Sequence, residues 1–543
     1  MCAVLLLFML AALSSESTAT RPEESTGVDF NVAFPENIAF YHPDPPLNSV
    51  KITALYDSTA VTITWYDDTV FIAPLTMAAG DIREFPGYGQ IAFQQLELRK
   101  NLEIANSTIK ITSTKTIIVH VLNFKNNSMQ TTLVTPTDKL GIKYLIPPVP
   151  TIEGTTHPTD MVTMAVTERQ PFRLVIVNAG EANTVTIQGA DTKDVTLEPH
   201  QIAQIYLTAD GTEQTVTAVN PIAVLFGHPC AIRHNCTCGL LYTTLPPAKA
   251  EKQKFYIPPI LAKDAEDKTF ILVSEAGFTE TEPFSTKTHF VEAAGTAILY
   301  RPGLLLSLIP ETDFGACFVV NMIAEAKNSA VIVVHKDLTD MVHLGSLPLP
   351  RRDWEPVEGT DYVSTSVDLM RDKNVFWHSS SKMAVYHVGS KEGALFGNPA
   401  PVISKSPDFR GCAMTPEAIK IGEVADGWRE SLEYCKGHDM QLVSLPQAQL
   451  QIQVANKIMQ MKNDTLKEVW IGMRRSSYTG EWYWLNKKPV NDTNWAEDEP
   501  GTVHDGQCAI MSLDRTKNFG WSDDDCCKDA HPVCYRSPIL FPV

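Results

Sequence analysis

From about residue 28 to residue 400, short runs rich in Val, Ile and Thr alternate with polar residues. Examples are SVKITALYD (49–57), STIKITSTKTIIVHVLNF (107–124) and FRLVIVNAG (172–180). Turn residues separate these runs. Alternation with a period of two, together with β-branched residues, is typical of strands in sandwiches and barrels. We therefore predict a mainly β region that no long amphipathic helix interrupts.

The β region contains internal repeats. The segment KYLIPP at 143–148 returns as KFYIPP at 254–259, after about 110 residues, which is the size of one β-sandwich. Ser113–Val119 returns loosely as Ala218–Val224, and a weaker copy lies at Ser380–Tyr386. We predict two or three tandem β-sandwich-like modules. A propeller-like arrangement is the alternative, because strand content does not fix how the sheets close.

A different pattern follows residues 401–411, which contain Pro, Ser and Gly and are typical of a linker. Apolar residues at helical spacing predict helices over Glu423–Lys436 and Pro446–Met461. Short strand signals then occur in EVWIGM (468–473), EWYWL (481–485), QCAIMSL (507–513) and PVCYR (532–536). The pattern predicts a small α+β domain over residues 412–538.

Composition narrows the class of protein. The chain has 543 residues, of which 44% are hydrophobic and 20% charged, as in globular proteins rather than disordered or collagen-like ones. The net charge is −18 and no basic block is present, which makes nucleic acid and anionic membranes poor partners because both repel such a chain. No run reaches the roughly 18 apolar residues of a membrane span.

The N-terminus and the cysteines indicate the compartment. An apolar run from Ala3 to Leu13 is followed by small residues, so residues 1–20 are predicted to be a signal peptide, with a buried first helix as the alternative. Removing Cys2 leaves an even number of the 11 cysteines, which favours disulfides in a secreted protein. Glycosylation is predicted at the sequons of Asn106, Asn126, Asn235, Asn463 and Asn491.

A segment rich in Cys and His lies at 227–238 (GHPCAIRHNCTC). Cys and His are zinc ligands, but a secreted chain favours disulfides here. This segment, LPP at 245–247, FYIPP at 255–259 and the opening residues 30–64 resemble the N-terminal region of the IgG Fc-binding protein family. The resemblance covers roughly residues 28–400 and implies an extracellular interaction module with glycoprotein partners such as mucins. Antibody binding is not implied, because the acidic residues common between the cysteines and LPP are absent.

The C-terminal landmarks resemble the C-type lectin-like domain family. They are WIGM at 470–473, WYW at 482–484, Trp495, Glu499-Pro500, Cys508, WSD at 521–523 and Cys526. The resemblance implies disulfides Cys435–Cys534 and Cys508–Cys526. Cys412 and Cys527 remain, and we expect them to pair with each other. An intermolecular bond is the alternative.

In this family, sugars bind through calcium, an ion that needs six to eight oxygen ligands. The family motif Glu-Pro-Asn, with the bond before Pro in cis, is Glu499-Pro500-Gly501 here, so one side-chain ligand is missing. The resemblance implies Glu499, Asp505 and Asp523 as ligands of Ca²⁺ and sugar, with Ser522 as a weaker metal ligand. The alternatives are a solvated acidic surface and loop contacts without metal.

No Gly-x-Ser-x-Gly, His-Glu-x-x-His or phosphate-loop motif occurs, and we predict that the chain is not an enzyme. We predict a secreted recognition glycoprotein that binds glycans or glycoproteins in innate immunity or cell adhesion. The alternative is a structural or adhesive protein of mucus or matrix, in which the lectin-like domain makes protein contacts without metal.

Overall fold

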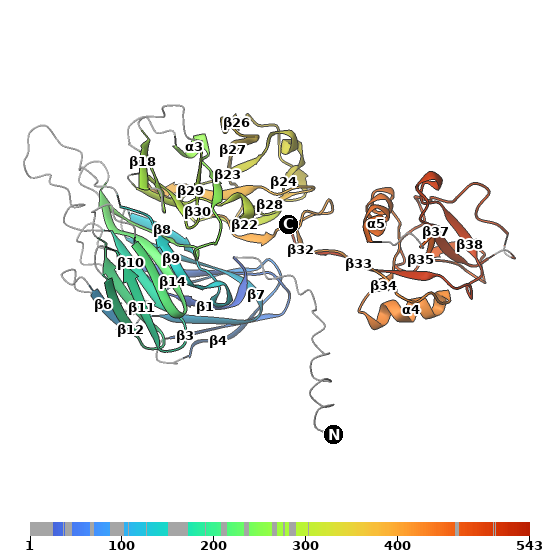
Figure 1. The fold of residues 1–543 in the computed structure, drawn as a ribbon, viewed down its shortest axis with the longest axis horizontal. Coiled ribbons are helices and arrows are strands. Elements are labelled where there is room, and N and C mark those ends of the chain that lie inside the picture. The colour runs from blue at the N-terminus through green and yellow to red at the C-terminus, as the bar shows by residue number, and fades with distance from the viewer. Residues whose placement is uncertain are drawn as a thin grey trace, which may run out of the picture. The chain divides into compact units, whose positions relative to one another are not determined.

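The computed structural model describes residues 25–35, 37, 46–65, 70–86, 102–106, 108–125, 128–149, 172–189, 192–207, 214–232, 238–262, 269–274, 277–281, 289–301, 303–461, 466–502, 504 and 506–543. The predicted signal peptide lies outside these residues. The chain divides into two compact units (Figure 1). The first ends at Ala413 and also takes in Phe541–Val543, and the second spans Met414–Leu540.

The first module of the first unit folds around one long strand, β7 (Ile109–Lys125). Its other strands are β1 (Gly27–Val32), β2 (Leu47–Ala54), β3 (Thr59–Trp65), β4 (Val70–Met77), β5 (Ile82–Pro86) and β8 (Ser128–Leu133). The first half of β7 pairs with β1 and β3, and the second half pairs with β2 and β8. Side chains from both halves of β7 face one core. The long strand therefore belongs to both layers of a sandwich-like module.

The second module repeats this arrangement around β14 (Gln214–Ile232). Its other strands are β9 (Gly141–Ile146), β10 (Arg173–Asn178), β11 (Asn183–Gln188), β12 (Thr192–Leu197), β13 (Gln201–Tyr206) and β15 (Cys238–Thr244). The first half of β14 pairs with β9 and β11, and the second half pairs with β10 and β15. The similar segments Ser113–Val119 and Ala218–Val224 lie where β7 and β14 change partners, so the sequence repeat has a counterpart in the strand pairing.

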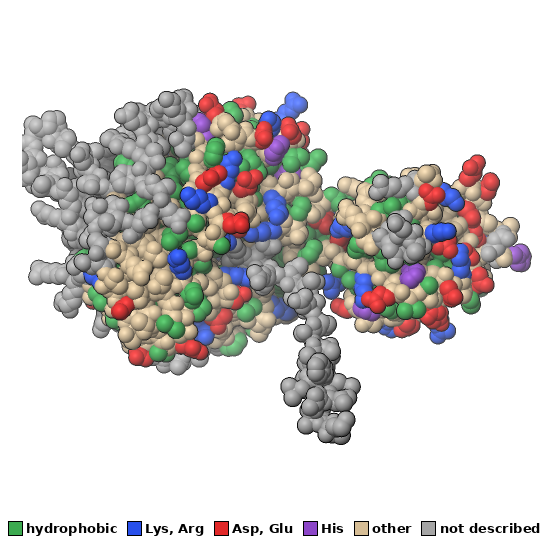
Figure 2. All heavy atoms as spheres, viewed as in Figure 1, with side chains coloured by type: hydrophobic (Ala, Val, Ile, Leu, Met, Phe, Trp, Pro, Cys, Tyr) green, Lys and Arg blue, Asp and Glu red, His purple; other side chains and the backbone are tan. Residues whose placement is uncertain are grey.

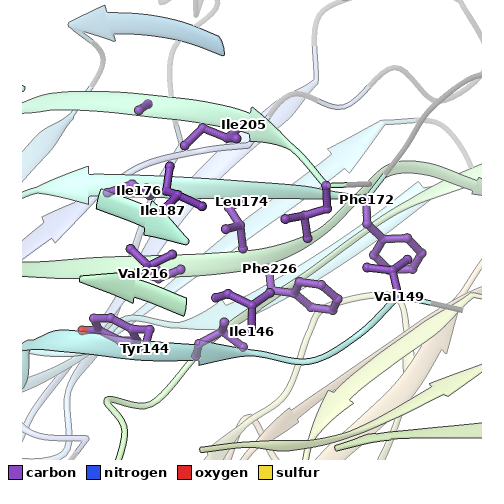
Figure 3. Close-up of a cluster of buried hydrophobic side chains, with 14 of the residues drawn as sticks. Tyr144, Ile146, Val149, Phe172, Leu174, Ile176, Ile187, Ile205, Val216 and Phe226 are labelled. Atoms are coloured by element: carbon purple, nitrogen blue, oxygen red, sulfur yellow. The ribbon is translucent and has the colours of Figure 1, made fainter. Parts of the chain in front are cut away.

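The core of the second module lies between its layers (Figure 3). Tyr144 and Ile146 of β9 and Phe226 of β14 are among its buried side chains. Each large apolar side chain buried here contributes roughly 1.5–3 kcal/mol. The neighbouring residue Gly227 has a packing role, because a Cβ there would overlap the carbonyl oxygen of Leu241 on β15. The glycine of the Gly-His motif therefore allows β14 and β15 to lie close together.

The rest of the first unit is also built of sheets. Its elements are β16 (Gln253–Tyr256), α3 (Pro259–Ala262), β17 (Thr269–Val273), β18 (Gly277–Thr281), β19 (Phe290–Ala293), β20 (Ala297–Arg301), β21 (Leu304–Ser307), β22 (Cys317–Asn321), β23 (Lys327–His335), β24 (Val342–Leu344), β25 (Leu347–Pro348), β26 (Glu355–Pro356), β27 (Tyr362–Asp368), β28 (Lys373–His378), β29 (Ala384–Lys391), β30 (Ala394–Pro399) and β31 (Val402–Ser404). The sheets β25-β24-β28-β22-β31 and β26-β27-β23-β29-β30 share one apolar core. The strand β6 (Leu102–Asn106) pairs with β13 and so connects the first two modules.

The expected bridge between Cys412 and Cys527 is wrong. Cys412 forms a disulfide with Cys317 on β22, with the two Cα atoms 5.3 Å apart. Cys412 belongs to the first unit and its carbonyl accepts a hydrogen bond from Phe541 N (2.8 Å), whereas Cys527 lies in the second unit and is exposed and free. Sequence spacing could not reveal that strand β22 passes beside the end of the linker.

A buried histidine lies where β29 packs near the first module. This residue is His387, and its ring atom Nε2 lies 2.9 Å from Oδ1 of Asn328. Burial, and then the neighbouring His120 on β7 and Lys51 on β2, lower the pKa of His387 to about 3. His387 is therefore neutral in the folded protein, although an unfolded histidine titrates near 6.5.

We expect acid to destabilise the first unit for this reason. Below pH ~6.5 His387 is protonated in the unfolded chain but stays neutral in the folded protein. The free energy of unfolding therefore falls as the pH drops from about 6.5 toward about 3. Denaturant unfolding at pH 7 and pH 5 measures the fall. His387→Gln keeps a donor toward Asn328 and should flatten the fall, whereas His438→Gln, on an exposed ring of the second unit, should not. An unchanged slope in His387→Gln would contradict the assignment.

The surface carries both signs of charge. Figure 2 shows Lys and Arg side chains scattered among Asp and Glu on the visible face. None of the helices in the described ranges combines the length and the apolar character of a bilayer-crossing segment. Short 3-10 turns lie at Thr137–Lys139, Glu311–Asp313, Lys336–Met341 and Arg515–Lys517.

The second unit combines two helices with a mixed sheet. Its elements are β32 (Ala413–Thr415), β33 (Ala418–Ile421), α4 (Trp428–Gly437), β34 (Gln441–Leu442), α5 (Ala448–Met461), β35 (Glu468–Arg475), β36 (Trp482–Trp484), β37 (Cys508–Ser512), β38 (Trp521–Asp524), β39 (His531–Arg536) and β40 (Ile539–Leu540). The main sheet has the order β33-β39-β35-β37-β38. Disulfides join Cys435 of α4 to Cys534 of β39 and Cys508 of β37 to Cys526.

The first helix of this unit begins later than the sequence predicts. The prediction began at Glu423, but α4 begins at Trp428. Gly422 N donates to the carbonyl of Pro532 (2.8 Å), and Asp426 forms a β-bridge with Ala530. The segment before α4 thus lies along the chain around β39 instead of entering the helix, which leaves Val424 exposed.

Candidate functional site

A group of tryptophans fixes the sheet of the second unit. Trp470, Trp484 and Trp521 are fully buried, and the rings of Trp484 and Trp521 meet edge to face with centroids 5.3 Å apart. Gly472 allows the chain before α5 to approach, because a Cβ there would lie 2.5 Å from the Leu442 carbonyl oxygen. Trp470 and Gly472 of WIGM and Trp521 of WSD are therefore packing positions.

The long loop between β36 and β37 is anchored to β38 by backbone hydrogen bonds. Trp521 N donates to Asn494 O, and Ala496 N donates to Trp521 O, both at 2.8 Å. The ring of Trp495 packs 5.8 Å from that of Trp521. This anchoring carries the following residues, including Glu499, to the edge of β38.

Two of the predicted site residues, Glu499 and Asp523, come together at this edge. Asp523 lies on β38, and its Oδ1 accepts a hydrogen bond from Gly501 N at 2.8 Å. The bond between Glu499 and Pro500 is cis. Burial, and then the neighbouring Asp523 carboxylate, raise the pKa of Glu499. The two acids form an interacting pair.

A residue that the sequence analysis did not single out completes the site. Arg475 ends β35, and its Nη2 donates to Gly501 O at 2.9 Å. Its Nη1 lies 4.0 Å from Asp523 Oδ2. The side chain of Asp523 is 1% exposed and that of Arg475 11% exposed. The sequence contained one signal for Arg475. It lies two residues after the core residue Met473, and side chains two residues apart on a strand point to the same face of the sheet.

The structure adds no further predicted metal ligand to this pair among the described residues. Asp505 lies outside the described residues. Ser522 precedes Asp523 on β38, so alternation directs its side chain to the opposite face. The nearby acids have other partners, since Asp524 Oδ2 pairs with Lys528 Nζ at 2.6 Å and Asp525 Oδ1 accepts from Cys527 N at 3.0 Å.

The described residues of this site do not by themselves make up the calcium site that the resemblance implies. Calcium takes six to eight oxygen ligands. The described part of the site offers the carboxylates of Glu499 and Asp523, and a guanidinium already faces Asp523. Within the described ranges, no three His, Cys, Asp or Glu side chains lie close enough to hold a metal ion.

Comparison with known proteins gives two family matches. Residues 424–536 match the family model described as Lectin C-type domain. These residues form a C-type lectin domain. Residues 130–288 match the model described as IgGFc binding protein, which covers the second sandwich-like module and the strands after it. Both descriptions name binding proteins, and Glu499, Asp523 and Arg475 all lie within the lectin match.

The chain covers only a small part of the first two human relatives named here. It is 29% identical over 310 residues to the human IgGFc-binding protein, covering 49% of this chain and 6% of that protein. The lectin domain is 34% identical over 67 residues to human C-type lectin domain family 17, member A, covering 12% of this chain and 17% of that protein. Human lithostathine aligns with 22% of this chain and 92% of its own, with 24% identity and a TM-score of 0.21.

The other predicted positions either lie away from Glu499 and Asp523 or fall outside the residues that the structure describes. Asn106 and Asn491 are exposed, whereas Asn126, Asn235 and Asn463 lie outside the described residues. His228 is buried in β14. The side chains of Cys230, His234, Cys236 and Cys238 are outside the description, so the choice between zinc and disulfides remains a prediction.

The first unit also contains a cavity of about 300 Å³. Apolar residues of the LPP segment at 245–247 line it, together with Lys139, Lys249, Lys405 and Asp313. Asp313 pairs with Lys405 at 3.0 Å and with Lys249 at 4.0 Å. The volume is at the lower end of small-molecule sites.

Proposed function

We propose that this protein is a secreted recognition glycoprotein whose lectin domain binds glycans or glycoproteins at the loop that carries Glu499. The single observation that carries the proposal is the meeting of Glu499 with Asp523 at the edge of β38. Carboxylates and backbone groups at such an edge are suited to hydroxyl-bearing ligands, because a carboxylate accepts hydrogen bonds strongly. The match to C-type lectin domains supports the same function.

The first unit is proposed to act as an extracellular interaction module with glycoprotein partners, mucins among them. Its match to the IgGFc-binding protein family supports this role. The disulfide between Cys317 and Cys412 suits an oxidising compartment. No antibody contact is part of the proposal.

A second candidate function is adhesion through metal-free protein contacts of the lectin domain. Gly501, which has no side-chain oxygen, and Arg475, which neutralises Asp523, favour this candidate. The two candidates differ in ligand, since one predicts retention on sugars and the other retention only on protein surfaces.

Glycan retention of the full-length chain tests the first candidate. The variant Glu499→Gln removes the charge of Glu499 and leaves the buried pair of Arg475 and Asp523 unchanged. It should lower retention on mannose or galactose beads by about tenfold or more, because charged hydrogen bonds are worth about 1.5–3 kcal/mol. The control Asp529→Asn changes an exposed acid of the same domain, and this variant should be retained on the beads as well as the unchanged protein.

Full retention of Glu499→Gln would contradict the site. Absence of retention in the unchanged protein on a broad glycan array, with binding to mucin polypeptide, would support the adhesive candidate instead.

A further inference from the structure

Arg475 occupies an unusual place in the lectin domain. Its guanidinium lies over the ring of Trp482, with Cζ 5.1 Å from the ring centroid, and donates to the carbonyl of Gly501 at 2.9 Å. Asp523, which Nη1 faces at 4.0 Å, accepts from the backbone N–H of the same Gly501. Both polar groups of Gly501 are thus bound by this one pair of charges.

The burial of the two charges makes each depend on the other. Arginine stays protonated at any physiological pH. A buried charge without a counter-charge is strongly destabilising, so Asp523 balances Arg475 and Arg475 balances Asp523. Nε and Nη1 of Arg475 and Oδ2 of Asp523 are buried and make no hydrogen bond to the described atoms. Besides their two hydrogen bonds to Gly501, attraction between the two charges compensates for their burial.

A calcium ion would compete with this arrangement. An ion bound to Asp523 Oδ2 at about 2.4 Å would lie at most about 6.4 Å from Nη1 of Arg475, since Nη1 is 4.0 Å from that oxygen. Two like charges at that separation in a buried place repel. The positive charge that this loop needs is already supplied by a side chain of the protein.

We infer that Arg475 replaces calcium in this lectin domain: its guanidinium holds Asp523 and Gly501 and so keeps the Glu499 loop in its binding position without metal. The inference deepens the proposed function and rests on it for its biological meaning. Its test needs no glycan, so the two can fail separately.

Hydrogen exchange of the full-length chain, followed by mass spectrometry, tests the inference. In the unchanged protein, exchange of residues 498–502 should be the same within about twofold in chelator and in millimolar calcium. Arg475→Gln removes the charge and should speed exchange of this segment by about tenfold or more. Arg475→Lys keeps the charge but not the two-pronged donor geometry, and should fall between the two.

The neighbouring arginine provides the matched control. Arg474 is the preceding residue of β35 and faces Trp428 instead, with Cζ 5.6 Å from that ring. Arg474→Gln should leave exchange of residues 498–502 unchanged. Peptides from β37 report whether the domain as a whole stays folded.

Two results would overturn the inference. One is a slowing of exchange of residues 498–502 by calcium of about tenfold or more in the unchanged protein. The other is unchanged exchange of this segment in Arg475→Gln. Should Arg475→Gln unfold the whole domain, the comparison of chelator with calcium in the unchanged protein decides, because it needs no variant.

Discussion

Trp521→Ala is expected to destabilise the lectin domain by about 3–5 kcal/mol, the usual cost of removing a buried tryptophan. Trp521 is fully buried, and its ring contacts those of Trp484 and Trp495. Its backbone also anchors the Glu499 loop through Asn494 and Ala496. We expect the loop to exchange faster even below the unfolding temperature, because the cavity loosens the strand that holds it.

Denaturant unfolding followed by tryptophan fluorescence measures the loss of stability. The control is Tyr478→Ala, which removes an aromatic ring that is 97% exposed and should change stability by less than about 0.5 kcal/mol. A loss of under about 1 kcal/mol in Trp521→Ala would show that the three rings are not the centre of this core.

The second large effect is expected from the disulfide between Cys317 and Cys412. The two residues are 95 apart in sequence, and in the chain-entropy model a loop of that length stabilises the folded state by about 4–5 kcal/mol. The double variant Cys317→Ala, Cys412→Ala should lose most of this amount in the first unit. Both cysteines are 1% exposed, so alanine leaves no buried polar group.

Cys527→Ala is the matched control, because Cys527 is exposed and free and its loss should leave stability unchanged. Peptide mapping without reduction adds a direct readout. Cys412 should be recovered linked to Cys317, with Cys527 open to alkylation. Recovery of a peptide pair that joins Cys412 to Cys527 would contradict the structure.

The sequence predicted the fold better than it predicted the site. Alternation and repeats predicted tandem sandwich-like modules, and the chain pairs its strands in that way around β7 and β14. Periodicity placed the second helix within two residues of α5 but began the first helix five residues early. Periodicity reports only local spacing, so it could not show that Gly422 and Asp426 form backbone contacts with residues around β39 that are distant in sequence.

The site was only half predicted, for a related reason. The landmarks identified Glu499 and Asp523, which do meet. They could not identify Arg475, because a charged residue at a strand end is usually solvated, and its burial depends on a loop that returns from 26 residues away. The pairing of Cys412 with Cys317 likewise depends on the packing of distant segments.

That disulfide has a mechanical consequence. The lectin domain is joined to the rest of the chain just after Cys412, and Cys412 is covalently tied to Cys317. Tension between the lectin domain and the N-terminal modules would pass across the sulfur atoms and bypass the chain between the two cysteines. The sheets built from the residues between Cys317 and Cys412 would therefore carry little of the applied force.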